Sequence, residues 1–160
     1  GEPGRGIATI LEMVQHTRLD CVIGSAGMMR GALAYAIHHA SHRIAFGRQL
    51  AEQPLMMAVL ADMALEVDAA ALLVYRAAWT KDAGAGRVTR EAAMAKLYAT
   101  EAAQRVIDAA VQIHGGDGVR AGHPVETLYR EIRALRIYEG ASDVQKIIIA
   151  RSALSSAAGG

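Results

Sequence analysis

The chain has 160 residues, which is enough for one domain with a substantial hydrophobic core. Apolar residues make up 52% of the sequence but aromatic residues only 4%, and with only three prolines this composition favours long, closely packed helices. A formal net charge of +1 gives no global signal for nucleic acid or an anionic membrane, a single cysteine excludes an internal disulfide, and no apolar run reaches the length of a membrane span.

The two ends of the chain are rich in small residues. The start, residues 1–6, reads as a linker that enters a helix, and residues 155–160 are predicted to form a flexible tail. We therefore expect one domain over residues 1–154, as a piece of a longer protein. The single Cys21 suits a reducing compartment and a small, buried apolar role, so we expect a cytoplasmic protein, or a mitochondrial one in a eukaryote.

Apolar residues recur at steps of three and four along most of the chain, which predicts helices. A short helix over 7–14 is followed by a polar patch at 15–18. A long helix then runs from Leu19, with three glycines for close packing, and ends at Gly47 as a left-handed C-cap, with Phe46 folded back on the core. A second helix runs from Pro54 to about Lys81, and a third begins after Thr89 as its N-cap.

The last third of the chain is less regular. A short helix is predicted over 125–133 and a final helix over 143–154, with Ser142 or Asp143 as its N-cap. No segment reads as a credible strand, and no internal repeat is present. The expected fold is all-α, an antiparallel up-down four-helix bundle of three long helices and a shorter final one.

Glu139 and Gly140 stand directly before the last predicted helix. At a loop-to-helix junction, a side chain can face a cleft instead of the bundle core. A carboxylate held near apolar groups binds a proton more tightly and can act as a general base. Spacing alone is weak evidence for such a base, because most Glu-Gly pairs form ordinary turns.

Three further polar patterns have simple structural readings. His38 and His42 lie one helical turn apart but lack a third ligand, so no metal site is expected. The glycines around Asp117 could offer backbone N–H groups to a phosphate, but they follow a helix instead of a strand and read first as a C-cap and turn. Arginines near loops and helix ends suit bidentate phosphate contacts, although most are expected to be solvated or ion-paired.

Four motifs, in this order and spacing, resemble the C-terminal domain of the acyl-CoA dehydrogenase family from Gly4 to about Leu154. They are Arg43-x-x-Phe46-Gly47, Gln112-Ile113-His114-Gly115-Gly116-Asp117-Gly118, Pro124-Val125-Glu126-x-x-Tyr129-Arg130, and Ile137-Tyr138-Glu139-Gly140 leading to Ile149-Ala150-Arg151. In the family this helical bundle follows an N-terminal helical domain and a middle β-domain, neither of which is in this sequence.

The resemblance implies an FAD-dependent oxidoreductase of fatty acid metabolism. Glu139 matches the base that takes the α-proton of an acyl-CoA while the β-hydride passes to flavin N5. The resemblance also implies an acyl-CoA substrate, an acceptor such as an electron-transfer flavoprotein, and a homodimer or homotetramer. Matching cofactor positions are Arg43, Gln112, Ile113, His114, Gly115, Gly116, Ser142 and Asp143, and matching substrate positions are Gln15, Arg18 and Gly140.

The sequence departs from the family pattern at several cofactor positions. Ala141 stands where a threonine is common, Ala45 replaces a hydroxyl residue, and Gln53-Pro54 replaces a polar pair. Two other interpretations stay open. One is a related flavoenzyme, such as an acyl-CoA oxidase or an enzyme with a non-CoA substrate, and the other is a stand-alone helical oligomerisation module without catalysis. We expect the isolated chain to hold flavin poorly and to lack turnover, because half of the pocket lies outside it.

Overall fold

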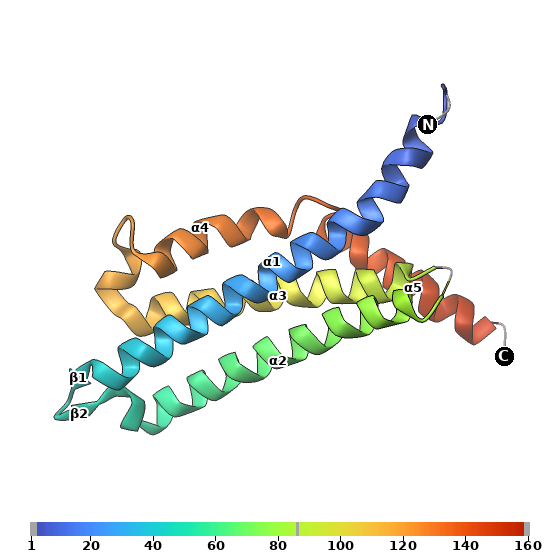
Figure 1. Ribbon diagram of the computed structural model, residues 1–160. Helices are drawn as coiled ribbons and strands as arrows, with labels where there is room; N and C mark the ends of the chain where they lie inside the picture. Colours follow the sequence, from blue (N-terminus) through green and yellow to red (C-terminus); the bar gives the residue numbers. More distant parts are fainter. Residues whose placement is uncertain (1–2, 86, 159–160) are drawn as a thin grey trace.

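The computed structural model describes residues 3–85 and 87–158, and at positions 8, 11, 12, 15, 16 and 158 it describes the backbone alone. Helices α1 to α4 alternate in direction and lie side by side, which confirms the antiparallel helical bundle (Figure 1). The helices are α1 (Gly6–His42), α2 (Pro54–Asp82), α3 (Thr89–His114), α4 (Pro124–Leu135) and α5 (Ser142–Ala158); the short elements are the strands β1 (Ile44–Ala45) and β2 (Arg48–Gln49) and the 3-10 segments η1 (Leu50–Glu52) and η2 (Gly115–Val119).

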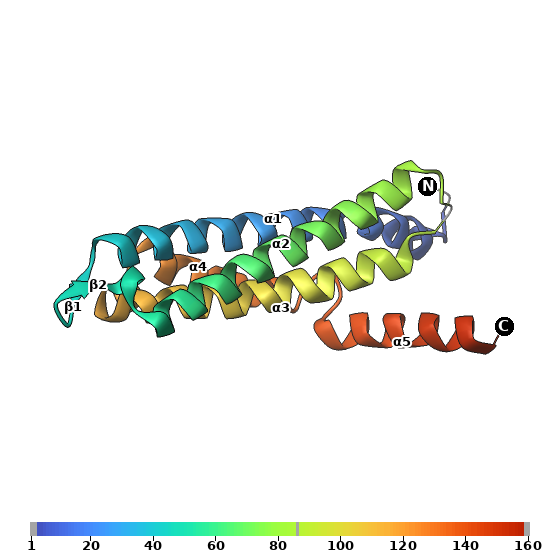
Figure 2. The ribbon, with the colours of Figure 1, turned by 90° about the horizontal axis from the view of Figure 1, so that it is seen from below.

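The fourth helix of the bundle is α4, and the final helix α5 lies outside it. Helix α3 is central and packs against α1, α2 and α4. Helix α5 packs on α3 and extends past the end of the bundle (Figure 2). The turn between α4 and α5 therefore lies at the edge of the bundle, where α1, α3 and α5 meet.

Helix α1 is continuous through the polar patch at residues 15–18, which the sequence suggested as a break. The patch contains no glycine or proline, so its backbone can remain helical. The three glycines that follow, Gly24, Gly27 and Gly31, do not mark close packing: a Cβ added at any of them meets no atom within 4 Å among the described residues. That part of the prediction was wrong.

The expected C-cap at Gly47 is instead the turn of a small β-hairpin. Ile44 pairs with Gln49 and Ala45 with Arg48, and the turn between them has positive φ at Phe46 (55°) and Gly47 (80°). Positive φ at both central residues is the requirement of a two-residue type I′ turn, which glycine meets without steric cost. Phe46 is 95% exposed and does not fold back on the core, so the predictions of no strand and of a buried Phe46 were both wrong.

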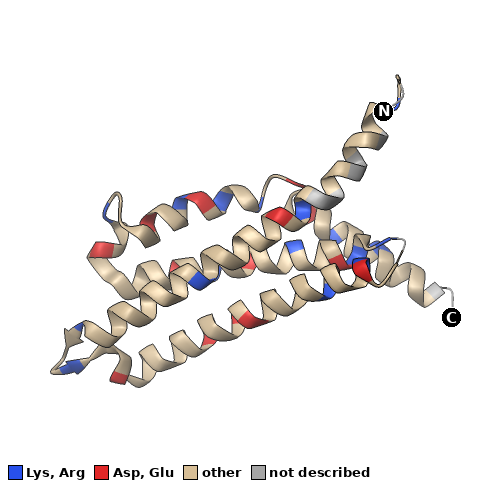
Figure 3. Ribbon diagram, in the orientation of Figure 1, with Lys and Arg blue, Asp and Glu red and all other residues tan. Residues whose placement is uncertain are grey.

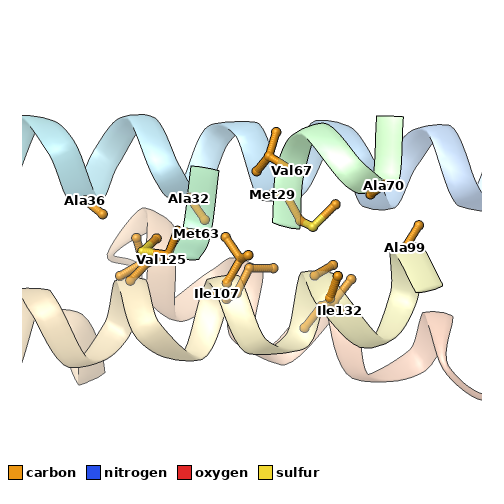
Figure 4. Packing of buried hydrophobic residues seen from close by; sticks show 14 of the residues in the cluster. Met29, Ala32, Ala36, Met63, Val67, Ala70, Ala99, Ile107, Val125 and Ile132 are labelled. Carbon is orange, nitrogen blue, oxygen red and sulfur yellow. The ribbon is translucent and has the colours of Figure 1, made fainter. Parts of the chain in front are cut away.

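The core is built mainly from alanine, with valine, isoleucine and methionine filling the wider gaps (Figure 4). Small side chains on the facing surfaces allow the long helices to approach closely. Helix α3 contributes the largest share of the buried apolar residues, whereas Ile37 on α1 stays 46% exposed. The buried α1 positions are Val22, Met29, Ala32, Ala36 and Ala40.

The helix termini differ from expectation in three places. Thr89 is the first residue of α3 and Val88 is its N-cap, without a side-chain cap. Ser142 is the first residue of α5, and its hydroxyl binds Glu101. Helix α5 continues over 155–158, where we expected a flexible tail, and residues 159–160 lie outside the described part.

Candidate active site

Glu139 lies in the turn between α4 and α5 with an unusual backbone conformation. Its φ is 57°, and that of Gly140 is 89°. A non-glycine residue in this region costs on the order of 1–3 kcal/mol, so it persists only where the surrounding structure holds it. Charged residues of both signs gather where this turn crosses α1 (Figure 3). Such strain is typical of functional sites.

Two side chains from different helices hold the turn by its carbonyl groups. Arg18 Nε of α1 donates to Glu139 O at 3.4 Å, and Gln145 Nε2 of α5 donates to Gly140 O at 2.9 Å. Gln145 is fully buried, and a Cβ added at Gly140 would lie 2.5 Å from its Nε2. Position 140 therefore requires glycine for both its backbone angle and its space.

The Glu139 carboxylate is oriented by a hydroxyl of α1. Thr17 Oγ1 donates to Glu139 Oε2 at 3.0 Å. Both residues are half-buried, as is Arg18. Burial lowers the pKa of the Arg18 guanidinium, and the nearby Glu139 opposes that shift. A carboxylate, a hydroxyl and a guanidinium thus meet at one edge of the bundle.

Behind the turn, Glu101 of α3 binds the start of α5. Its Oε1 accepts from Ser142 Oγ at 2.5 Å and from Arg136 Nε at 3.0 Å, and its Oε2 lies 2.7 Å from an Arg136 guanidinium nitrogen. Burial alone would raise the pKa of Glu101, but the bonds from Ser142 and Arg136 outweigh it and hold that pKa below its usual value. The hydroxyl hydrogen of Ser142 is therefore used within the chain, while Asp143 is 90% exposed and lies 3.5 Å from Lys146.

All but one of the other predicted cofactor residues lie at the C-terminal end of α3, around a cavity of about 420 Å³. Imidazole rings are in contact there: the centroids of His39 and His114 are 4.5 Å apart, and those of His114 and His123 are 4.9 Å apart. Burial is the main cause that lowers the pKa values of His39 and His123. The cavity is lined by His39, Arg43, Ala45, Leu50, Ile113, His114, Gly115, Gly116 and Asp117.

The donor set of this cavity fits a phosphate group. Arg43 supplies a guanidinium, and a Cβ added at Gly115 or Gly116 would meet no atom within 4 Å, so the glycine backbone is open on that side. Asp117 brings one carboxylate, which lies 3.7 Å from a guanidinium nitrogen of Arg120. From Glu101, which binds Ser142, to His114 the distance along α3 is about 20 Å at 1.5 Å per residue. The residues implied for the cofactor thus form two separate groups.

One implied cofactor position joins neither group. Gln112 is exposed on α3 and does not line the cavity. Gln15 lies in α1, but its side chain is outside the described part of the structure. Gln53, one of the departures from the family pattern, donates from Nε2 to Ala45 O at 3.3 Å and so braces the hairpin.

The structure adds residues that sequence reasoning missed: Thr17, Lys96, Glu101 and Gln145. Thr17 lies between Gln15 and Arg18, which the family resemblance implicated, but nothing in the sequence shows that Thr17 faces Glu139. Lys96 and Glu101 are the charged residues within an alanine-rich stretch of α3, which is the one sequence signal that could have marked them. Cys21 is half-buried, whereas we expected it to be a buried core residue.

Comparison with known proteins identifies the chain. A family model described as acyl-CoA dehydrogenase, C-terminal domain, matches residues 4–154. The chain is 40% identical over 149 residues to the caffeyl-CoA reductase-Etf complex subunit CarC of Acetobacterium woodii, covering 93% of this chain and 39% of that protein. It is also 40% identical over 156 residues to the human mitochondrial short-chain specific acyl-CoA dehydrogenase, covering 98% of this chain and 38% of that protein.

Among solved structures, butyryl-CoA dehydrogenase from Megasphaera elsdenii is similar, with a TM-score of 0.91 and 34% identity, over 96% of this chain and 40% of that one. The chain therefore belongs to the acyl-CoA dehydrogenase family and corresponds to its C-terminal domain. It spans about two fifths of the length of these relatives. Within the described residues, no helix is long and apolar enough to cross a membrane, and no three His, Cys, Asp or Glu side chains are grouped as a metal site would need.

Proposed function

We propose that this chain is the base-bearing domain of an FAD-dependent enzyme that dehydrogenates an acyl-CoA thioester between its α and β carbons. The observation that carries the proposal is the Glu139 turn. Thr17 donates to the Glu139 carboxylate, and Arg18 and Gln145 hold the strained backbone of the turn by its carbonyl groups. Such bracing places the carboxylate in one position, as proton transfer requires.

Glu139 acts as the general base. The thioester makes the α C–H of the substrate acidic, and the Glu139 carboxylate accepts that proton. Thr17 holds Oε2, so the proton is accepted at Oε1. The flavin, when bound, supplies the acceptor at N5 for the hydride that leaves the β carbon. The product is the α,β-unsaturated thioester, and the base must release its proton before the next turnover.

Arg18 and Gly140 form the wall of the site beside the base. The guanidinium of Arg18 is half-buried and donates to the Glu139 carbonyl, so it fixes the turn and leaves a positive charge close by. A cation there favours the approach of an anionic substrate such as an acyl-CoA. Gln15, one turn earlier in the same helix, is part of the same proposal.

The cofactor is proposed to contact both groups of residues. The two groups are too far apart for one small part of the cofactor to reach both. Arg43, Ile113, His114 and the glycines after it would hold a phosphate portion of FAD, and Ser142 and Asp143 would lie near the flavin ring. A separation of about 20 Å along α3 suits a cofactor shared between two copies of the chain, with the phosphate cavity of one copy serving the flavin beside the base of the other. Gln112 would take part from its exposed position in such a dimer or tetramer.

The names of the relatives favour a second direction for the same chemistry. Some are named as reductases, including caffeyl-CoA reductase and acryloyl-CoA reductase. By microscopic reversibility, Glu139 would then donate the α-proton to an unsaturated thioester. The name of the Acetobacterium woodii relative also supports an electron-transfer flavoprotein as the redox partner.

The direct test replaces Glu139 with glutamine in the full-length parent protein. Glutamine has nearly the same shape but cannot accept the proton at neutral pH, so turnover with acyl-CoA substrates should fall by about 10³-fold or more while bound flavin absorbance is retained. The matched control is Glu131→Gln, at an exposed carboxylate of α4 outside the turn. Turnover of the Glu139 variant within a factor of about three of the wild type would remove Glu139 from the mechanism.

Product assays separate the remaining alternatives. Peroxide formation in air without an added acceptor would identify an oxidase, whereas reduction of an electron-transfer flavoprotein would identify a dehydrogenase. Full-length protein that neither retains flavin nor turns over any acyl-CoA would instead favour a helical assembly module.

A further inference from the structure

His39 of α1 lines the same cavity as Arg43, although it lies outside the four sequence motifs. The two residues are one helical turn apart, and the backbone N–H of Arg43 donates to His39 O at 2.9 Å. The half-buried ring of His39 packs on that of His114, with centroids 4.5 Å apart. A cavity whose donors fit a phosphate therefore also holds a titratable imidazole beside its guanidinium.

Ring packing alone is a poor explanation for the histidines at this cavity. His114 is 8% exposed, and its Nδ1–H donates to Ala110 O at 2.7 Å, because a carbonyl oxygen can only accept. Its ring also contacts that of His123, the N-cap of α4, whose buried Nδ1 has no hydrogen-bond partner among the described residues. Apolar rings would fill the same space without burying unpaired nitrogen atoms.

The charges around His39 favour a neutral ring as long as no anion is bound. Burial is the main cause that lowers the pKa of His39, and the Arg43 guanidinium lowers it further. Asp117 acts in the opposite direction, but its carboxylate also lies 3.7 Å from Arg120. An anion beside Arg43 would reverse this balance, because a nearby negative charge favours the protonated imidazole. The titratable and charged groups that face the histidine rings are Arg43 of α1, His114 of α3, Asp117 of η2, Arg120 after η2 and His123 before α4.

We propose that His39 is a phosphate-binding residue of this cavity and that it takes up a proton from solvent when an anion binds beside Arg43. This inference rests on the proposed function, in which the cavity holds a phosphate portion of the cofactor. The imidazolium adds a second cation to the site, and both of its ring nitrogens are donors. Because the bound state carries one proton more than the free state, anion binding should tighten as the pH falls through the histidine range.

Sulfate is the probe for this coupling. It has the charge and shape of a phosphate dianion, but it takes up no proton between roughly pH 5 and 8, so every proton gained on binding belongs to the protein. The imidazole C–H signals of the 160-residue protein are followed by NMR against pH, in sulfate and in chloride of equal ionic strength. Chemical shifts are preferred to melting temperatures because sulfate stabilises folded proteins without binding to a site.

In sulfate we expect the pKa of His39 to rise by about one pH unit, and sulfate to bind about tenfold more tightly at roughly pH 5 than at roughly pH 8. His38 is the internal control, since it is exposed, lies outside the cavity lining and packs on His42. Its titration should be the same in sulfate and in chloride. An equal pKa of His39 in both salts would overturn the inference.

Two substitutions separate proton uptake from ring packing. His39→Phe keeps a ring against His114 but cannot titrate, and His39→Gln keeps polar atoms without a titratable group. Both variants should bind sulfate without the tightening at low pH, whereas His38→Phe should keep the pH dependence of the wild type. Folded His39 variants that keep the wild-type pH dependence would overturn the inference. If neither variant folds, the wild-type titration in the two salts still decides it.

Arg43→Ala, run in the same titration, separates this inference from the proposed function. If sulfate binds at no pH, or binds Arg43→Ala as tightly as the wild type, the proposed phosphate contact fails and the inference about His39 fails with it. If binding requires Arg43 but does not depend on pH, the inference about His39 alone fails. The turnover of Glu139→Gln tests the base, which is a separate part of the proposed function.

Discussion

Replacing Gly140 with alanine should destabilise the chain through two separate effects. The backbone at Gly140 has a φ of 89°, which for an alanine costs on the order of 1–3 kcal/mol. The new Cβ would also lie 2.5 Å from Gln145 Nε2, which displaces Gln145 from its bond to Gly140 O. Loss of that bond adds about 0.5–1.5 kcal/mol. We expect a total loss of about 1.5–4.5 kcal/mol in the free energy of unfolding.

Gly122 offers a matched control for this substitution. Its φ of 84° is nearly the same, but an added Cβ there meets no atom within 4 Å. Gly122→Ala should therefore cost only the backbone term, about 1–3 kcal/mol. Urea denaturation followed by far-ultraviolet circular dichroism measures both losses, provided that each transition is two-state.

A double-mutant cycle identifies the source of the extra loss. If the clash with Gln145 is responsible, Gly140→Ala should cost less in a Gln145→Ala background than in the wild type. Equal losses for the two glycine variants, together with additive behaviour in the cycle, would refute the view that Gln145 is packed against Gly140.

Three further predictions concern the site. Thr17→Val keeps the shape of the side chain but removes the hydroxyl that donates to Glu139, so kcat of the full-length enzyme should fall about tenfold, whereas Thr80→Val, at an exposed end of α2, should not change it. The pKa of Glu101 is lower in the fold than in the unfolded chain, so its ionised form stabilises the fold above pH 4.5, and this stabilisation is lost as the pH falls through the lower folded value. Glu101→Gln should therefore flatten that part of the curve of unfolding free energy against pH. An unchanged curve would contradict the ion pair with Arg136. Arg43→Ala should lower the flavin retained by the full-length protein after gel filtration, while Arg48→Ala in the adjacent hairpin, outside the cavity lining, should retain as much as the wild type.

The helical fold could be read from the sequence because it depends on local spacing. Apolar residues at steps of three and four, Pro54 at the start of α2 and the glycines after α3 are local signals, and they located the bundle helices closely. The hairpin after α1 was missed because its strands are too short for a period-two pattern to appear, so Gly47 looked like the end of a helix.

The resemblance to the family also pointed to Glu139, Gly140, Arg18 and Arg43 from the sequence alone. Only the tertiary structure showed that Thr17 binds the Glu139 carboxylate, because residues 17 and 139 belong to separate parts of the chain. It also separated the residues implied for the cofactor into two groups, one near the middle of α3 and one at its C-terminal end, since the sequence order of motifs does not give their distance in space. A contact between distant segments depends on how the helices pack, and helix periodicity alone does not specify which polar side chains meet at the end of a bundle.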